Sequence, residues 1–202
     1  MPSQGPLLST SSSSVANGSG NAWTNPNNIN NSDGFYAVGA TTGTQYNELL
    51  KASAFGFSIP SDGTNINITV RIRGKVSNAA NPHSEFHLYL SKDGSTQVGT
   101  DRSYVNAWTA SDVTYSYGGN AWGTTWTPAE INASTFSVFF SGVDGFADFP
   151  SFSVDFIDVT VDYTLPGGGL FFGFFRKAWE WLKGRKKQQV RTFRPQPAFA
   201  GV

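Results

Sequence analysis

The chain has two histidines, His83 and His87, which are the side chains best suited to bind a metal or carry a proton. A metal pair needs two imidazoles that converge on one point. On an extended strand, residues four positions apart are separated by about 13 Å. The spacing therefore predicts exposed histidines on a strand, or His83 in the adjoining loop, rather than a metal site. We expect no metal and no other cofactor.

Carboxylates are the second group that could do chemistry, and they gather in two stretches. Asp144 and Asp148 lie in a predicted loop, where oxygen ligands could hold Ca²⁺, but their spacing does not match an EF-hand. Asp155, Asp158 and Asp162 lie in a predicted strand, and we interpret them as its solvated face. A glycosidase would need two carboxylates held across a cleft at a fixed separation, which the sequence does not indicate.

Covalent catalysis has even less support in the sequence. The 202 residues include no cysteine, which excludes thiolate chemistry and disulfides and fits assembly in a reducing cytosol. A serine nucleophile often stands in a Gly-X-Ser-X-Gly turn, and no such turn occurs in the chain. We therefore expect a protein without enzymatic activity.

Aromatic side chains make up 15% of the chain, with 17 Phe, 6 Trp and 7 Tyr. Trp108, Trp122 and Trp126 could form a flat platform on which a sugar ring stacks, which makes them candidate glycan contacts. The alternative is that these side chains fill the core, as most aromatic residues do in a small β-sandwich. Exposure of the indole rings would distinguish the two interpretations.

The elements that would position these residues are short antiparallel strands. Apolar and polar residues alternate in Asn65–Arg73, as expected for a strand with one buried face. Glu85–Leu90 repeats the pattern, which places Phe86 inside and His87 outside. Further strands are predicted at Phe35–Ala40, Leu49–Ile59, Val113–Tyr117, Phe136–Phe140 and Phe152–Tyr163. Because no helices alternate with these strands, we predict an all-β fold, an antiparallel β-sandwich of the jelly-roll type.

Three local signals mark turns and irregularities within this fold. Ser91–Gly94 contains Asp-Gly and predicts a hairpin turn. Thr127–Glu130 has the pattern of a capping box with proline at the first helical position, which predicts a short helix between strands. The alternation in the last strand changes phase at Ile157–Asp158, which predicts a β-bulge there.

Composition and charge divide the chain into three parts. Residues 1–21 are rich in Ser, Gly and Asn and predict a flexible arm, residues 22–165 form the β-sandwich, and residues 166–202 begin with a glycine hinge. Residues 1–165 contain six basic and 13 acidic residues, a net charge of −7, whereas residues 166–202 contain eight basic residues and one acidic residue, a net charge of +7. This asymmetry suggests that the two parts have different partners.

The last part has the pattern of a basic amphipathic helix followed by an extended tail. Apolar residues recur at helical spacing from Phe171 to Leu182, and Pro195 and Pro197 keep the end of the chain extended. The predicted partner-docking residues are Phe171, Phe172, Phe174, Phe175, Trp179, Trp181, Leu182, Phe193 and Phe199. The predicted electrostatic contacts are Arg176, Lys177, Lys183, Arg185, Lys186, Lys187, Arg191 and Arg194. Such an anchor could meet a partner protein, a membrane surface, nucleic acid or its own sandwich, and we favour the partner protein.

Three stretches carry a resemblance to a known family. Phe55–Val76, Trp122–Val138 and Val154–Thr164 resemble segments of the jelly-roll-like β-sandwich modules in structural proteins of tailed bacteriophages. The resemblance covers roughly residues 22–164 and excludes the arm and the tail. It implies a virion module such as a head decoration or cement protein, a fibre base or a tail appendage.

Taken with the basic tail, the resemblance implies a non-enzymatic virion structural protein, assembled in the host cytoplasm. We expect it to decorate or cement the capsid as a minor capsid protein, anchored through its tail to the major capsid protein or to other virion proteins. We expect a homo-oligomer, with a trimer favoured, and no role for nucleic acid. The alternatives are a glycan-binding β-sandwich module and a protein bound to a membrane surface by the tail.

Overall fold

The computed structural model describes residues 1–18, 20–41, 46–103, 105–144 and 148–166. The chain divides into one compact unit from Met1 to Leu165 and a second from Pro166 to Val202. All the described helices and strands belong to the first unit. The predicted docking residues of the tail, from Phe171 to Phe199, lie outside the described residues.

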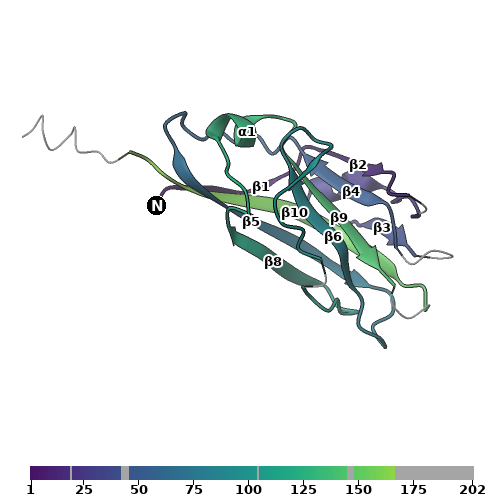
Figure 1. The fold of residues 1–202 in the computed structure, drawn as a ribbon. Coiled ribbons are helices and arrows are strands. Elements are labelled where there is room, and N and C mark those ends of the chain that lie inside the picture. Colours follow the sequence, from purple (N-terminus) through teal and green to yellow (C-terminus); the bar gives the residue numbers. More distant parts are fainter. Residues whose placement is uncertain (19, 42–45, 104, 145–147, 167–202) are drawn as a thin grey trace, which may run out of the picture. The chain divides into compact units, whose positions relative to one another are not determined.

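The first unit is a sandwich of two five-stranded antiparallel sheets (Figure 1). Sheet A consists of β1 (Ser3–Leu8), β3 (Ala37–Ala40), β5 (Thr64–Val76), β8 (Val113–Asn120) and β10 (Ser151–Thr164). Sheet B consists of β2 (Ser11–Val15), β4 (Leu49–Ser53), β6 (Ser84–Ser91), β7 (Gln97–Val98) and β9 (Ser137–Val143). Two short helices, η1 (Pro26–Asn30, a 3₁₀ helix) and α1 (Pro128–Asn132), connect strands.

The strand order confirms the predicted antiparallel sandwich of the jelly-roll type. From β3 onward, one sheet runs β3-β10-β5-β8 and the other β4-β9-β6-β7, so that consecutive strands cross between the sheets except at the β6–β7 hairpin. This is the arrangement of two interlocked Greek keys. No helix among the described residues is long and apolar enough to cross a membrane.

The core lies between the two sheets and follows from the alternation in the sequence. In β5, Ile68, Val70 and Ile72 are fully buried, while the residues between them point outward. Their neighbours on β10, Val159 and Val161, are fully buried as well. Each such side chain contributes about 1.5–3 kcal/mol to folding relative to leaving it in water.

The N-terminal residues were predicted to be a flexible arm, and this prediction is wrong. β1 pairs with β10 and β2 pairs with β4, so the first 15 residues provide an edge strand to each sheet. Their low apolar content misled the prediction because an edge strand is held largely by backbone hydrogen bonds. Serine side chains support it further: Ser14 Oγ donates to Glu48 Oε2 at 2.7 Å and Ser9 Oγ donates to Asn30 Oδ1 at 2.9 Å.

The predicted strand Leu49–Ile59 is shorter than expected. β4 ends at Ser53 because Ala54 takes a left-handed conformation, with φ of 56°, which turns the chain out of the sheet. The remaining apolar residues still reach the core from a loop, and Ile59 is tied to α1: its N–H donates to Asn132 Oδ1 at 2.7 Å. The capping box at α1 is confirmed, with Thr127 as the N-cap.

Two β-bulges change which side chains face outward. The bulge predicted at Ile157–Asp158 lies two to three residues earlier, where Asp155 is the extra residue between Val154 and Phe156. A second bulge, which was not predicted, makes Phe86 the extra residue between Glu85 and His87 in β6. Bulges of this kind turn neighbouring side chains to the same face. Glu85 therefore points into the core, and the prediction that Phe86 lies inside is wrong.

Candidate functional site

The three tryptophans proposed as glycan contacts are buried. The exposed fractions of Trp108, Trp122 and Trp126 are 2%, 0% and 8%. Each indole N–H donates to an internal acceptor: Trp108 to Glu85 Oε1 at 3.0 Å, Trp122 to Ile68 O at 2.9 Å and Trp126 to Ala121 O at 3.0 Å. These rings fill the core, so the proposal that they form a sugar platform is wrong.

A different set of aromatic rings lies on the outer face of sheet B. Leu49, Tyr89 and Phe139 form a small apolar cluster that is separate from the main core, with Val15 packed against it. The strand register explains this grouping, since Val15 lies opposite Leu49, and Phe139 lies opposite Tyr89. These side chains point away from the core because their sequence neighbours, such as Phe140, point into it.

Three further rings, those of Tyr46, Phe86 and His87, continue this cluster along the sheet. Together with Tyr89 and Phe139 they form what we call the aromatic strip. The Tyr46 and Phe86 rings stack at 4.7 Å with an angle of 15° between their planes. The centres of the Phe86 and His87 rings are 4.3 Å apart, and those of the His87 and Tyr89 rings are 6.1 Å apart. Tyr89 stacks on Phe139 at 5.1 Å. The rings therefore form an unbroken ladder of contacts.

The β6 bulge is what makes the strip continuous. It places Phe86 and His87 on the same face, which ordinary alternation would have prevented. Tyr46 reaches this face through an isolated bridge to Val143, at the end of β9. Tyr89 and Phe139 are 7% and 1% exposed, whereas the Tyr46, Phe86 and His87 end is half-buried and open to solvent.

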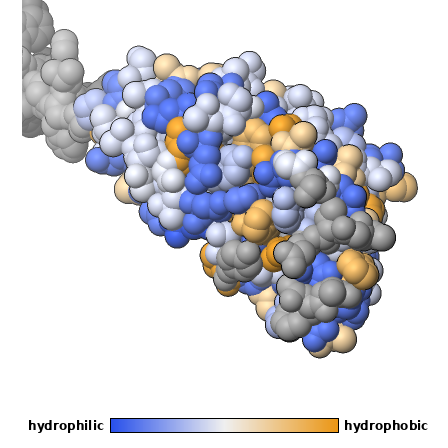
Figure 2. All heavy atoms as spheres, turned by 45° about the vertical axis from the view of Figure 1, so that its right-hand side comes forward, coloured by the Kyte–Doolittle hydropathy of each residue, from blue (hydrophilic) through white to orange (hydrophobic). Residues whose placement is uncertain are grey.

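Polar groups border the strip. His87 Nδ1 lies 2.7 Å from Asp101 Oδ2, and the other carboxylate oxygen of Asp101 accepts from Leu88 N at 2.9 Å. Lys51 Nζ lies 5.7 Å from the centre of the Phe139 ring. Burial, and secondarily the negative charge of Asp101, raise the pKa of Tyr89, so its phenol stays protonated at neutral pH. Figure 2 shows that apolar residues reach the surface in separate patches among hydrophilic ones.

The outer face of sheet A has a different character, because it is crossed by ion pairs. Arg71 Nε donates to Asp158 Oδ1 at 2.9 Å, and Arg73 Nη1 lies 3.4 Å from Asp155 Oδ2. The prediction that Asp155, Asp158 and Asp162 form a solvated face is wrong for Asp155 and Asp158, which are 1% and 4% exposed, while Asp162 is half-buried. Their partners neutralise them, so they do not form a glycosidase pair.

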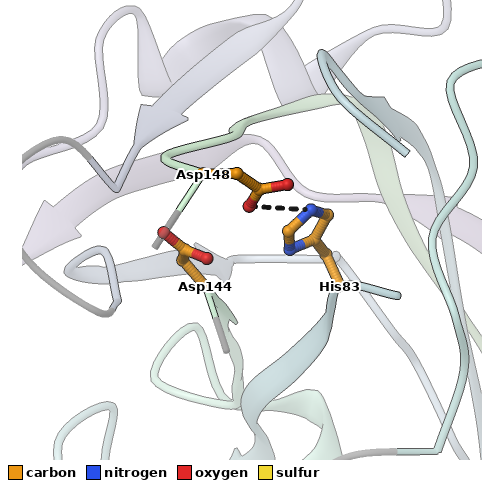
Figure 3. Close-up of side chains that lie close together, drawn as sticks. All are labelled: His83, Asp144 and Asp148. Atoms are coloured by element: carbon orange, nitrogen blue, oxygen red, sulfur yellow. Dashed lines mark ion pairs between the residues drawn. The ribbon is translucent and has the colours of Figure 1, made fainter. Parts of the chain in front are cut away.

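A third feature, shown in Figure 3, lies where β6, β9 and β10 meet at one end of the sandwich. His83, Asp144 and Asp148 each present a ligand atom there, and these atoms all lie within 4.8 Å of one another. His83 Nε2 is 3.3 Å from Asp148 Oδ1. His83 and Asp144 are buried, and Asp148 is half-buried. The group contains the donor types that a divalent cation needs.

The sequence offered no direct signal for this grouping. Asp144 and Asp148 were recognised as a pair, but His83 is about sixty positions away in the chain. The antiparallel register supplies the missing link, because Ser84 lies opposite Val143, which places His83 and Asp144 side by side just beyond the pair. His87, the histidine first considered together with His83, lies in the aromatic strip instead.

Comparison with known proteins finds no matching family model and no matching curated protein. Among solved structures, the chain is similar to one titled "CBM4 structure and function", with 16% identity, a TM-score of 0.40, and coverage of 64% of this chain and 84% of the other. It is also similar to the N-terminal cellulose-binding domain of Cellulomonas fimi β-1,4-glucanase C, with 16% identity, a TM-score of 0.37, and coverage of 66% and 81%. Likenesses this distant assign no function to the chain.

Proposed function

We propose that the protein is a non-catalytic binding module that holds a glycan against the outer face of sheet B. The observation that carries this proposal is the aromatic strip. Sugar rings present patches of C–H groups that pack on aromatic faces, and their hydroxyl groups need polar partners around the rim. The strip provides both, with rings at its centre and the His87–Asp101 pair at its side.

The rings are held in place before any ligand arrives. Tyr46 is fixed by its bridge to Val143 and by stacking on Phe86, and Phe86 is fixed in turn by the bulge in β6. A rigid aromatic surface loses little conformational entropy on binding, so more of the contact energy is retained as affinity. The half-buried end of the strip, at Tyr46 and Phe86, is where we place the first sugar contact.

The acids on and beside β6 support binding rather than hydrolysis. The carboxylate of Glu85 lies in the core, where it accepts hydrogen bonds from Trp108, Tyr117 and two backbone N–H groups. The carboxylate of Asp101 is engaged with His87 and with Leu88 N. Neither is placed as a general acid opposite a nucleophile, which glycoside hydrolysis requires.

Replacing Phe86 or Tyr46 by alanine should weaken glycan binding at least tenfold, because each ring supplies a stacking surface at the half-buried end of the strip, which is open to solvent. Binding is measured by affinity electrophoresis and titration calorimetry against soluble β-glucans, xylans, mannans and bacterial surface polysaccharides. Phe35→Ala is the matched control, since Phe35 is 68% exposed and precedes β3 of the other sheet. Wild-type protein that binds no polysaccharide, or Phe86→Ala protein that binds as wild type does, would contradict the proposal.

We also propose, as a second function, that the tail attaches this sandwich to a larger assembly of the tailed-phage virion type. The supporting observation is the charge division, with −7 on residues 1–165 and +7 on residues 166–202. The two functions are compatible because they use different parts of the chain. A glycan-binding sandwich anchored to a particle would be displayed where it could meet a cell surface.

The attachment proposal predicts that the full-length chain sediments with purified particles of the encoding phage, and that a chain ending at Leu165 stays in solution. The shortened chain retains every element of the first compact unit, and its fold is checked by circular dichroism. Equal sedimentation of both chains would place the interface on the sandwich. If neither chain sediments, the attachment proposal is wrong.

A further inference from the structure

We propose that His83, Asp144 and Asp148 form a binding site for a divalent transition-metal cation, of the Zn²⁺ or Mn²⁺ class. Their ligand atoms lie within 4.8 Å of one another. A single ion placed between them would therefore be within about 2.8 Å of each ligand atom before any side chain moves. A shift of at most about 0.6–0.8 Å per side chain then brings each bond to the 2.0–2.2 Å that zinc requires. Figure 3 shows the three side chains converging on one region.

The donor set determines the class of cation. One imidazole nitrogen and two carboxylate oxygens suit Zn²⁺ and Mn²⁺, whereas Ca²⁺ prefers six to eight oxygen ligands. Three protein ligands leave room for water at the remaining positions. The site is also mostly closed to solvent, with His83 fully buried and Asp144 only 2% exposed.

Asp148 is oriented by its neighbours as a metal ligand would be. Its Oδ2 accepts from Asn78 Nδ2 and Asn81 Nδ2, both at 3.0 Å. This leaves Oδ1 directed at His83 Nε2, at 3.3 Å, and Oδ1 is buried without a hydrogen bond from any described residue. Partners that fix a ligand in this way are typical of metal sites.

The other two ligands are supported as well. His83 is held by its backbone, because Trp108 N donates to His83 O at 2.8 Å, and its ring meets Phe152 edge-on at 6.5 Å. Asp144 Oδ2 accepts from Phe149 N at 2.9 Å. Contacts with the surrounding fold therefore hold each of the three proposed ligands in position.

Electrostatics favour an ion at this position. Two carboxylates within 4.8 Å of each other in a poorly solvated site repel one another. A divalent cation would neutralise both and would join the start of β6, the end of β9 and the segment leading into β10. The site would therefore stabilise the end of sheet B at which Tyr46 pairs with Val143, next to the aromatic strip.

The test uses the full-length protein, free of any affinity tag, after treatment with a chelator and its removal. Zn²⁺, Mn²⁺ and Ca²⁺ are added separately, and thermal unfolding and calorimetric titration are recorded. We expect Zn²⁺ or Mn²⁺ to bind with a stoichiometry of one and to raise Tm by roughly 5–10 °C at a free concentration of about 100 Kd. Ca²⁺ should produce a much smaller shift.

Two variants locate the site. Asp148→Asn keeps the shape of a half-buried side chain and should reduce cation affinity at least tenfold without unfolding the protein. His87→Gln is the matched control because His87 is the chain's other histidine, and it should leave the affinity unchanged. Absence of saturable binding, loss of binding in His87→Gln, unchanged binding in Asp148→Asn, or binding of Ca²⁺ alone would each overturn the proposal. No glycan is involved, so the outcome is independent of the binding function proposed above.

Discussion

Replacing Glu85 by alanine is expected to lower the free energy of unfolding by about 4 kcal/mol. Glu85 is fully buried, and its Oε1 accepts from Trp108 Nε1 at 3.0 Å and from the hydroxyl of Tyr117. Its Oε2 accepts from Val105 N at 3.0 Å and Asn106 N at 3.1 Å. Alanine would leave these four donors without an acceptor in a poorly solvated interior. Equilibrium denaturation with urea measures the change.

The expected loss of stability in Glu85→Ala depends on the protonation of the donors as well as on the carboxylate itself. Burial, and secondarily the charge of Glu85, raise the pKa of Tyr117 well above its usual range, so Tyr117 remains a neutral donor. Glu85→Gln retains one acceptor oxygen but turns an amide N–H₂ group toward donors. Its free energy of unfolding should therefore lie between those of the wild type and Glu85→Ala. Asp62→Ala, at an exposed turn, should change stability by less than about 0.5 kcal/mol. A loss below 1 kcal/mol for Glu85→Ala would contradict this account of the network.

The parts of the fold that the sequence predicts well are those in which local pattern and burial agree. β5 was recognisable because its alternation runs without interruption, and α1 because Thr127 and Glu130 have the capping-box spacing. β1 and β2 were not recognisable, since an edge strand of serines is determined by the strand it pairs with. The pairing partners, β10 and β4, lie far along the chain.

The candidate sites were harder to predict because both depend on strand register. The aromatic strip requires the extra residue in β6, which leaves Phe86 and His87 on one face, and nothing in Glu85–Leu90 indicates that bulge. The His83–Asp144–Asp148 group requires β6 and β9 to be neighbours in a particular register. Composition revealed that aromatic and acidic side chains were available, but not which of them would meet.

Trp108 is a residue of the core and does not belong to the proposed glycan-binding face. Its indole stacks on Tyr115 at 4.8 Å and on Phe140 at 5.1 Å, and it meets Phe152 edge-on at 5.4 Å. Its N–H is one of the four donors to Glu85. This side chain therefore combines the packing of a large core aromatic with part of a buried hydrogen-bond network.

Trp108→Ala is expected to lower the free energy of unfolding by about 4–5 kcal/mol, since it leaves a cavity and removes a donor from Glu85. The loss should not add to that of Glu85→Ala, because the two side chains share a hydrogen bond, and a double-mutant cycle should show coupling of roughly 1–2 kcal/mol. Phe86→Ala should show the reverse behaviour, with weaker glycan binding and a stability change of about 1 kcal/mol or less. If folded Trp108→Ala protein instead lost glycan affinity while retaining its stability, the tryptophans would be the platform after all, and the aromatic strip would not be the binding face.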